Sequence, residues 1–127
     1  MRNPNQIKVN IARNTKKDIK ITIELIEDIC YNRFKSPEHL VGTVEYHKTL
    51  IKRMHTSLSH ESASPTPDDF GVLRLLTKII KQMDRLQEHH EQNENTSKDT
   101  TLLLNYLNEL ELQMELMKDR AEFKLNN

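Results

Sequence analysis

One stretch of the chain, residues 66–90, reads TPDDFGVLRLLTKIIKQMDRLQEHH and carries a full set of helix signals. Thr66 is a good N-cap residue, Pro67 suits the first helical position, and the acids that follow favour the positive end of the helix dipole. Apolar side chains then recur at spacings of four and three, at Val72, Leu76, Ile79, Met83 and Leu86, with His90 ending the series. This spacing puts one apolar stripe on one face, so the stretch predicts an amphipathic helix.

Three other segments show the same periodicity and predict helices over residues 16–35, 37–60 and 99–125. Their expected starts are, in order, the capping motif from Thr15 to Asp18, the pair Ser36-Pro37, and Ser97 or Asp99. The residues expected to be buried are Ile19, Ile23, Ile26, Cys30 and Phe34 in the first; Leu40, Val44, His47, Ile51, Met54 and Leu58 in the second; and Leu103, Leu107, Leu110, Met114, Met117 and Ala121 in the last.

The composition favours helices and a single domain. Of the 127 residues only two are Gly and four are Pro, which is too little turn chemistry for a fold made of many short strands. An isolated amphipathic helix is marginal in water, because its apolar stripe needs a partner surface. Four stripes joined by short polar connectors therefore predict an all-α fold, an antiparallel four-helix bundle formed by residues 15–127.

Residues 1–14 are expected to form a basic N-terminal arm, either extended or disordered. Residues 1–20 carry six basic side chains against one acid, and the alternation of Ile7, Val9 and Ile11 with polar residues suits a β-ribbon. A strand followed by two helices is similar in order to the ribbon-helix-helix family of DNA-binding dimers. That resemblance implies an alternative function, a small DNA-binding regulator that contacts the duplex through Gln6, Lys8, Asn10, Arg13, Lys16 and Lys17.

A second resemblance concerns catalysis. The segment from Arg85 to His90 resembles the Arg and His spacing of the HEPN family of small four-helix ribonucleases, in which the two side chains converge on a scissile phosphate. The resemblance covers only this short segment, and Leu86 stands where that family has a polar residue. It implies a third function, ribonuclease activity, with Arg85 and His90 as the reacting pair.

Several other chemistries find no basis in the sequence. Glycine occurs only at positions 42 and 71, so neither a dinucleotide-binding nor a P-loop glycine pattern can form. No two of the six histidines are three or four residues apart and no Glu-x-x-His motif occurs, so we expect no metal site and no cofactor. Cys30, the single cysteine, cannot form an internal disulfide, and charges interrupt every apolar run, which predicts a cytoplasmic protein without a membrane span.

The C-terminal helix carries a second apolar stripe. At about 100° per residue, Leu112, Leu116 and Phe123 project together, nearly opposite the stripe expected to be buried. In the first helix, Ile21 and Leu25 also fall away from the main stripe. One bundle contact cannot cover two faces, so these residues predict an interface with a second copy or with another protein. The primary expectation is a non-enzymatic helical interaction protein with no small-molecule substrate.

Overall fold

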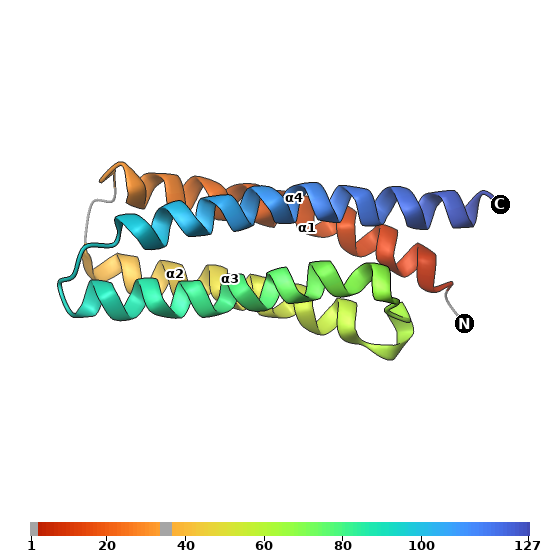
Figure 1. The fold of residues 1–127 in the computed structure, drawn as a ribbon, viewed down its shortest axis with the longest axis horizontal. Coiled ribbons are helices and arrows are strands. Elements are labelled where there is room, and N and C mark those ends of the chain that lie inside the picture. The colour runs from red at the N-terminus through yellow and green to blue at the C-terminus, as the bar shows by residue number, and fades with distance from the viewer. Residues whose placement is uncertain (1–2, 34–36) are drawn as a thin grey trace.

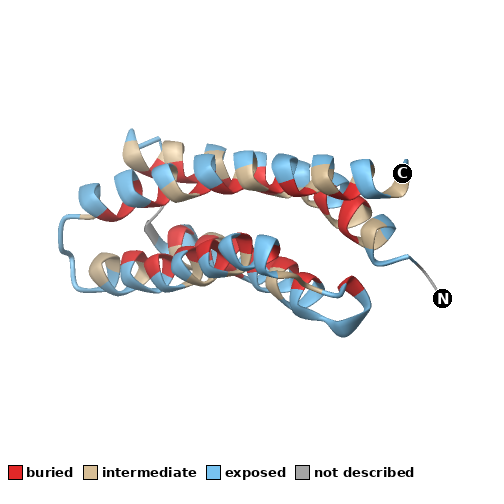
Figure 2. Ribbon diagram, turned by 45° about the vertical axis from the view of Figure 1, so that its right-hand side comes forward, coloured by how far each residue is buried: buried red, intermediate tan, exposed pale blue. Residues whose placement is uncertain are grey.

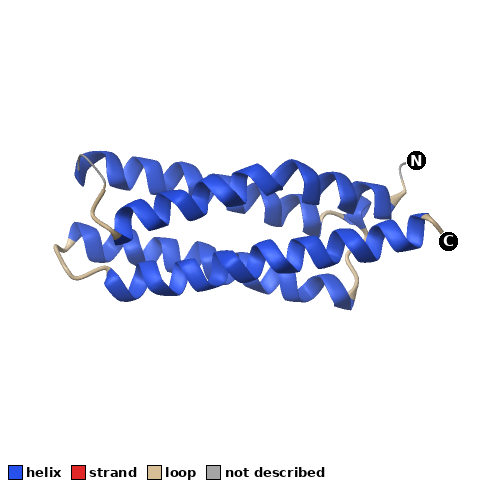
Figure 3. Cartoon of the chain, turned by 90° about the horizontal axis from the view of Figure 1, so that it is seen from above, coloured by secondary structure: helices blue, strands red, loops and turns tan. Residues whose placement is uncertain are grey.

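The computed structural model describes residues 3–33 and 37–127, and within these ranges the chain is all-α (Figure 1). Four long helices follow one another: α1 Pro4–Cys30, α2 Pro37–Ser59, α3 Pro67–Glu91 and α4 Ser97–Leu125. A short 3₁₀ helix, η1 Glu61–Ala63, lies between α2 and α3, where the sequence predicts a loop. Figure 3 shows the long helices running alongside one another with short connections. The predicted four-helix bundle is confirmed.

The helices pack in two layers, with α1 beside α4 and α2 beside α3 (Figure 1). The contact between α1 and α4 is the most extensive in the bundle, and the contact between α1 and α2 is much smaller. Buried positions face the space between the two layers (Figure 2). The α1–α4 layer therefore has an outer side that no other part of the described chain covers.

The core is aliphatic and lies where the periodicity predicts it for three of the four helices. The predicted stripes of α2 and α4 are buried at every position, and the α3 stripe is buried from Val72 to Leu86, with His90 half-buried. Removing such side chains from water stabilises the fold by about 25 cal/mol per Å² of apolar surface. The helices that sequence periodicity defines therefore do bury one another's apolar faces.

The start of α3 forms as expected, whereas the start of α4 does not. The Asp69 carboxylate accepts a hydrogen bond from the Thr66 backbone N–H at 2.8 Å, which closes a capping box. At α4 the N-cap residue is Thr96, and the preceding Asn95 side chain accepts from the Ser97 backbone N–H at 2.8 Å. Neither predicted cap is used, because Ser97 is the first residue of the helix and the Asp99 side chain is turned into the bundle. Ser36, the predicted cap of α2, lies outside the described residues.

The expected N-terminal arm, extended or disordered over residues 1–14, is wrong for residues 4–14, and so is the expected helix start at Thr15. The α1 helix begins at Pro4, and the Asn3 side chain caps it by accepting from the Asn5 backbone N–H at 2.8 Å. The Thr15 hydroxyl donates instead to the Ile11 carbonyl oxygen, one helical turn back. Val9 and Ala12 are buried, so packing against the bundle outweighs the strand-like alternation of this segment.

The buried face of α1 is broader than predicted and rotated from the expected stripe. Ile19 and Ile26 are buried as expected, but Ile23 and Cys30 are only half-buried, and Phe34 lies outside the described residues. Additional buried positions are Lys8, Val9, Ala12, Thr22, Leu25 and Ile29. The reason is that α1 contacts both α4 and α2, and two contacts bury two adjacent faces of one helix.

Candidate interaction surface

The outer face of α4 exposes the three large apolar side chains of the predicted second stripe. Leu112 is 54% exposed, Leu116 is 41% exposed and Phe123 is 69% exposed. On the opposite face of the same helix the residues from Leu103 to Ala121 that make the core stripe are buried. The helix is therefore apolar on both its inner and outer sides, and the described part of the chain covers only the inner one.

The two α1 residues predicted for the same interface are less exposed than the three α4 residues. Ile21 is half-buried, whereas Leu25 is buried in the core. The prediction for Leu25 is therefore wrong, because the broad buried face of α1 includes this position. Sequence projection could not reveal this, since Ile19, Ile21, Ile23 and Leu25 spread apolar side chains around much of the helix.

A groove of about 380 Å³ runs between α1 and α4 next to Leu112. Apolar side chains of Ala12, Ile19, Leu112 and Met114 line it together with five polar ones. The polar lining is Lys16 and Lys20 on α1, and Asn108, Glu111 and Glu115 on α4. The groove thus lies next to the exposed apolar residues of α4. Cations of α1 and acids of α4 line its two sides. We call this combined area the α1–α4 face; it comprises the groove residues, Leu116, Phe123, and the exposed Arg13 and Lys17.

The charges of the α1–α4 face are divided between its two helices. Arg13 donates to the Glu122 carboxylate at 3.2 Å across the helix pair. The hydrogen bond from Lys118 is the main cause that lowers the pKa of Glu115, and the positive charge of Lys16 lowers it further. The same bond raises the pKa of Lys118. Apart from Lys118, which pairs with Glu115 on α4, the cations of this face therefore lie along α1 and the acids along the facing edge of α4.

The residues predicted to contact DNA do not form a ribbon. Gln6 donates to the Asn10 side chain at 2.9 Å on one face of α1, in the manner of a helical i, i+4 pair. Lys8 is buried and its ammonium lies 2.7 Å from the Asp69 carboxylate, so it cannot contact phosphate in this fold. Lys17 is exposed, and Lys16 borders the groove. The ribbon form of the DNA-binding hypothesis is therefore wrong.

Burial and ion pairing act in opposite directions on Asp69. Burial by itself raises the pKa of this carboxyl, whereas the hydrogen bonds from Lys8 and from the Thr66 backbone lower it, and the net shift is downward. Asp69 therefore stays charged while it holds the start of α3 against α1. Sequence periodicity missed this pair, because nothing in the spacing of either helix shows that Lys8 turns inward.

The residues of the ribonuclease hypothesis lie near the end of α3. Arg85 is exposed on α3, and the Nδ1 of the neighbouring His89 lies 2.7 Å from Asp99 Oδ2. The other oxygen of Asp99 accepts from the Gln82 amide at 2.7 Å. The hydrogen bond to Asp99 is the main cause that raises the pKa of His89. This network ties the end of α3 to the first turn of α4.

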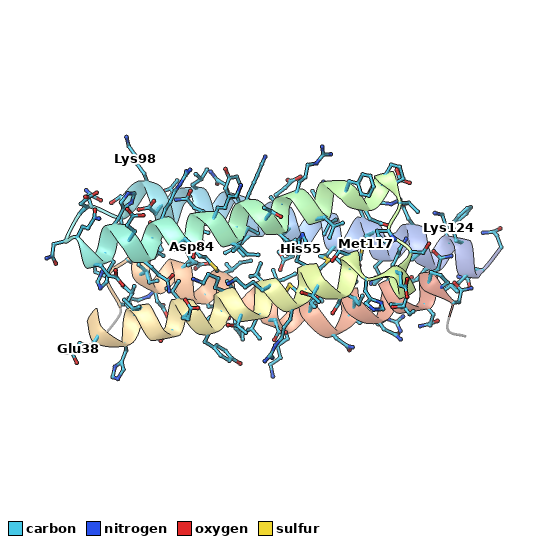
Figure 4. The ribbon with its side chains drawn as sticks, turned by 90° about the horizontal axis from the view of Figure 1, so that it is seen from below. Glu38, His55, Asp84, Lys98, Met117 and Lys124 are labelled. Atoms are coloured by element: carbon cyan, nitrogen blue, oxygen red, sulfur yellow. The ribbon has the colours of Figure 1, made fainter. Side chains whose placement is uncertain are left out.

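A further polar cluster joins α2 to α3. The Lys48 ammonium donates to Asp84 at 2.7 Å and to Gln87 at 3.0 Å, and it lies 2.7 Å from Glu45. Figure 4 labels Asp84 at this boundary between the two helices. Burial lowers the pKa of Lys48, but the hydrogen bonds to the carboxylates outweigh it and raise the pKa overall. The cluster fixes the second layer of the bundle.

Neither a metal cluster nor a membrane span is found in the described ranges. Residues 3–33 and 37–127 contain no group of three or more His, Cys, Asp or Glu side chains that could hold a metal ion. No helix in these ranges is both long enough and apolar enough to cross a membrane. Comparison with known proteins gave no match to a family model, to a curated protein or to a solved structure. The α1–α4 face is therefore the feature of the molecule that bears on its function.

Proposed function

We propose that this protein is a non-enzymatic helical interaction protein that binds a protein surface, of a second copy or of a partner, through the outer face of α4. The observation that carries the proposal is the exposure of Leu112, Leu116 and Phe123 along one side of a helix whose other side is buried. Single exposed apolar residues are common on protein surfaces, but an aligned set beside a groove is typical of an interaction site.

The surroundings of these three side chains fit a protein interface. The groove beside Leu112 adds apolar lining, and the charged side chains at its edges supply a polar rim. Protein interfaces combine an apolar centre with such a rim. An active site instead holds its reacting groups in fixed positions on a rigid shell, whereas Lys16, Lys20 and Glu115 are long and exposed. An intracellular location is part of the proposal, since the one cysteine has no disulfide partner in the chain.

Site-specific photo-cross-linking tests the proposal. A photoreactive residue at Leu116 should give a discrete protein adduct in cells that express the protein, and adding Phe123→Asp to the same chain should abolish that adduct. The matched control carries the photoreactive residue at Arg53, which is exposed on α2, in the other layer. Absence of any Leu116 adduct, or an equal adduct from Arg53, would contradict the proposal. Helicity measured by circular dichroism must be unchanged in every variant.

A further inference from the structure

We propose that the α1–α4 face binds a second copy of this chain, with a twofold axis that runs parallel to the helices between α1 and α4. This inference rests on the proposed function and names its partner. The evidence is the distribution of charge on the face: Arg13, Lys16, Lys17 and Lys20 lie on α1, whereas Glu111, Glu115 and Glu122 lie on α4, where Lys118 is paired with Glu115. Such a face complements itself when α1 of one copy covers α4 of the other.

The two rows of charge lie at the same level along the bundle. The helices are antiparallel, and Arg13 reaches Glu122 within the chain at 3.2 Å. Further along, Lys16 and Lys20 line the same groove as Glu111 and Glu115. A rotation about an axis parallel to the helices moves no residue along the bundle. The cations of one copy therefore meet the acids of the other without any sliding, and each contact occurs twice.

Other symmetric arrangements bring like charges together. A twofold axis across the helices would place α1 against α1, with Lys16 and Lys20 facing their own counterparts, and α4 against α4. A dimer formed by α4 alone would bring Glu111 and Glu115 towards the same residues of the second copy. Like charges that face each other across an interface repel, which disfavours both arrangements. The parallel axis is the arrangement that pairs α1 cations with α4 acids.

Two apolar side chains of the face, Leu112 and Leu116, also find cover in this arrangement. The charge of Lys16 acts on Glu115, so these two residues lie close to the same level of the antiparallel pair. This register places Leu112 level with about residue 19 and Leu116 level with about residue 15. The half-buried Ile21 and the aliphatic stem of Lys17 of the second copy then lie opposite these leucines. Lysine stems cover apolar surface while their ammonium groups stay in water, so the cations contribute both packing and charge.

The size of the face suits a stable dimer. The helices have 27 and 29 residues, and at 1.5 Å per residue each is about 40 Å long. Two helices packed about 8 to 10 Å apart present a face about 20 Å wide, so roughly 800 Å² per copy would be covered. This is about the area that each partner contributes to a standard protein–protein interface.

A charge-reversal mixture tests the axis. We expect the wild-type chain to sediment as a dimer, and both Lys16→Glu/Lys20→Glu and Glu111→Lys/Glu115→Lys to weaken self-association about 100-fold. An equimolar mixture of the two variants should restore the dimer, because each helix then meets opposite charge on the other chain. If the lysine variant alone still dimerises like wild type, the contact uses α4 only and the proposed axis is wrong. Circular dichroism and thermal unfolding check that each variant folds.

Cysteine cross-linking tests the register without altering the groove charges. In a Cys30→Ser background, one chain carries Lys17→Cys and a second chain of different tag carries Leu116→Cys. The mixture should form a disulfide-linked heterodimer on mild oxidation, whereas neither variant should cross-link to itself. The control pairs Lys17→Cys with Arg53→Cys, which lies in the other layer, and should not cross-link. A Leu116→Cys homodimer in place of the mixed product would overturn the proposed axis.

Different results would refute the dimer and the proposed interaction function. A protein that stays monomeric up to about 500 μM in analytical ultracentrifugation would refute the dimer, since interfaces of this area have dissociation constants in the micromolar range or below. The same protein could still give a Leu116-dependent adduct with another protein, in which case the interaction function stands. If the protein is monomeric and also gives no Leu116-dependent adduct, the interaction function is refuted as well.

Discussion

The Thr22 hydroxyl on α1 and His47 Nδ1 on α2 lie 2.8 Å apart inside the bundle. The same hydroxyl donates to the Asp18 carbonyl oxygen at 2.8 Å, and its lone pair accepts from His47 when the ring carries its proton on Nδ1. This buried hydrogen bond is the only described side-chain hydrogen bond between α1 and α2 and lies where the two helices share little contact. Protonation of His47 should therefore affect the contact between the two layers.

The first prediction concerns acid sensitivity. Burial lowers the pKa of His47, and the negative charge of Asp18 opposes that shift only partly. A lowered folded-state pKa means that the stabilisation is fully present above the unfolded value of about 6.5 and is lost as pH falls through the folded value. We expect the free energy of unfolding, measured in urea, to decrease between pH 7 and pH 5. His47→Leu should show a smaller decrease; an identical slope would contradict this origin.

The second prediction concerns stability between pH 6 and pH 8. The pKa of His89 is raised, chiefly by its hydrogen bond to Asp99, so its stabilising contribution is present below about pH 6.5 and is lost as pH rises through the folded value. Asp99→Asn should remove this dependence between pH 6 and pH 8. Nuclear magnetic resonance titration of the His89 ring gives the direct readout. A His89 titration that is unchanged in the Asp99→Asn protein would show that another group causes the shift.

The third prediction concerns the buried pair of Lys8 and Asp69. Their charged atoms lie 2.7 Å apart, and both side chains are almost fully covered. Removing one partner leaves an uncompensated buried charge, so Lys8→Met should lower the free energy of unfolding by about 3 kcal/mol. Lys8→Met/Asp69→Asn should cost less than the sum of the two single changes, because neither charge is then left alone. Strict additivity in urea unfolding would mean that the pair is not coupled.

The fourth prediction compares two leucines of one helix. Leu107 is completely buried, whereas Leu112 is more than half exposed. Leu107→Ala should therefore lower the free energy of unfolding by about 2 to 5 kcal/mol, the usual range for a large core side chain. Leu112→Ala should change it by less than about 0.5 kcal/mol when measured at a concentration where the chain is monomeric. Equal costs would show that the outer face of α4 is packed within the chain.

The sequence predicted the bundle and the buried faces of three helices because each carries one well-defined apolar stripe. The first helix was harder to predict, since its apolar residues both alternate and recur at helical spacing. The pair Asn3-Pro4 is a cap and first-turn signal that could have located its start. By contrast, no pattern could show that Lys8 pairs with Asp69 or that His89 pairs with Asp99. Those contacts depend on how the helices are rotated, which packing decides. A helical projection of the sequence does locate the exposed apolar stripe of α4, because that helix is long and regular.

The last prediction concerns nucleic acid. Arg13, Lys16, Lys17 and Lys20 would supply the phosphate contacts of a DNA-binding face, but Glu111, Glu115 and Glu122 lie on the same surface. Phosphates would be repelled by these acids, so we expect no measurable binding of a 20-base-pair duplex in fluorescence anisotropy at about 50 mM salt, where electrostatic contacts are strong. Glu111→Lys/Glu115→Lys removes the acids and should create salt-sensitive binding, which serves as the positive control. Tight wild-type binding that weakens with Lys17→Ala and with added salt would instead restore the DNA-binding hypothesis, through a helix face rather than a ribbon.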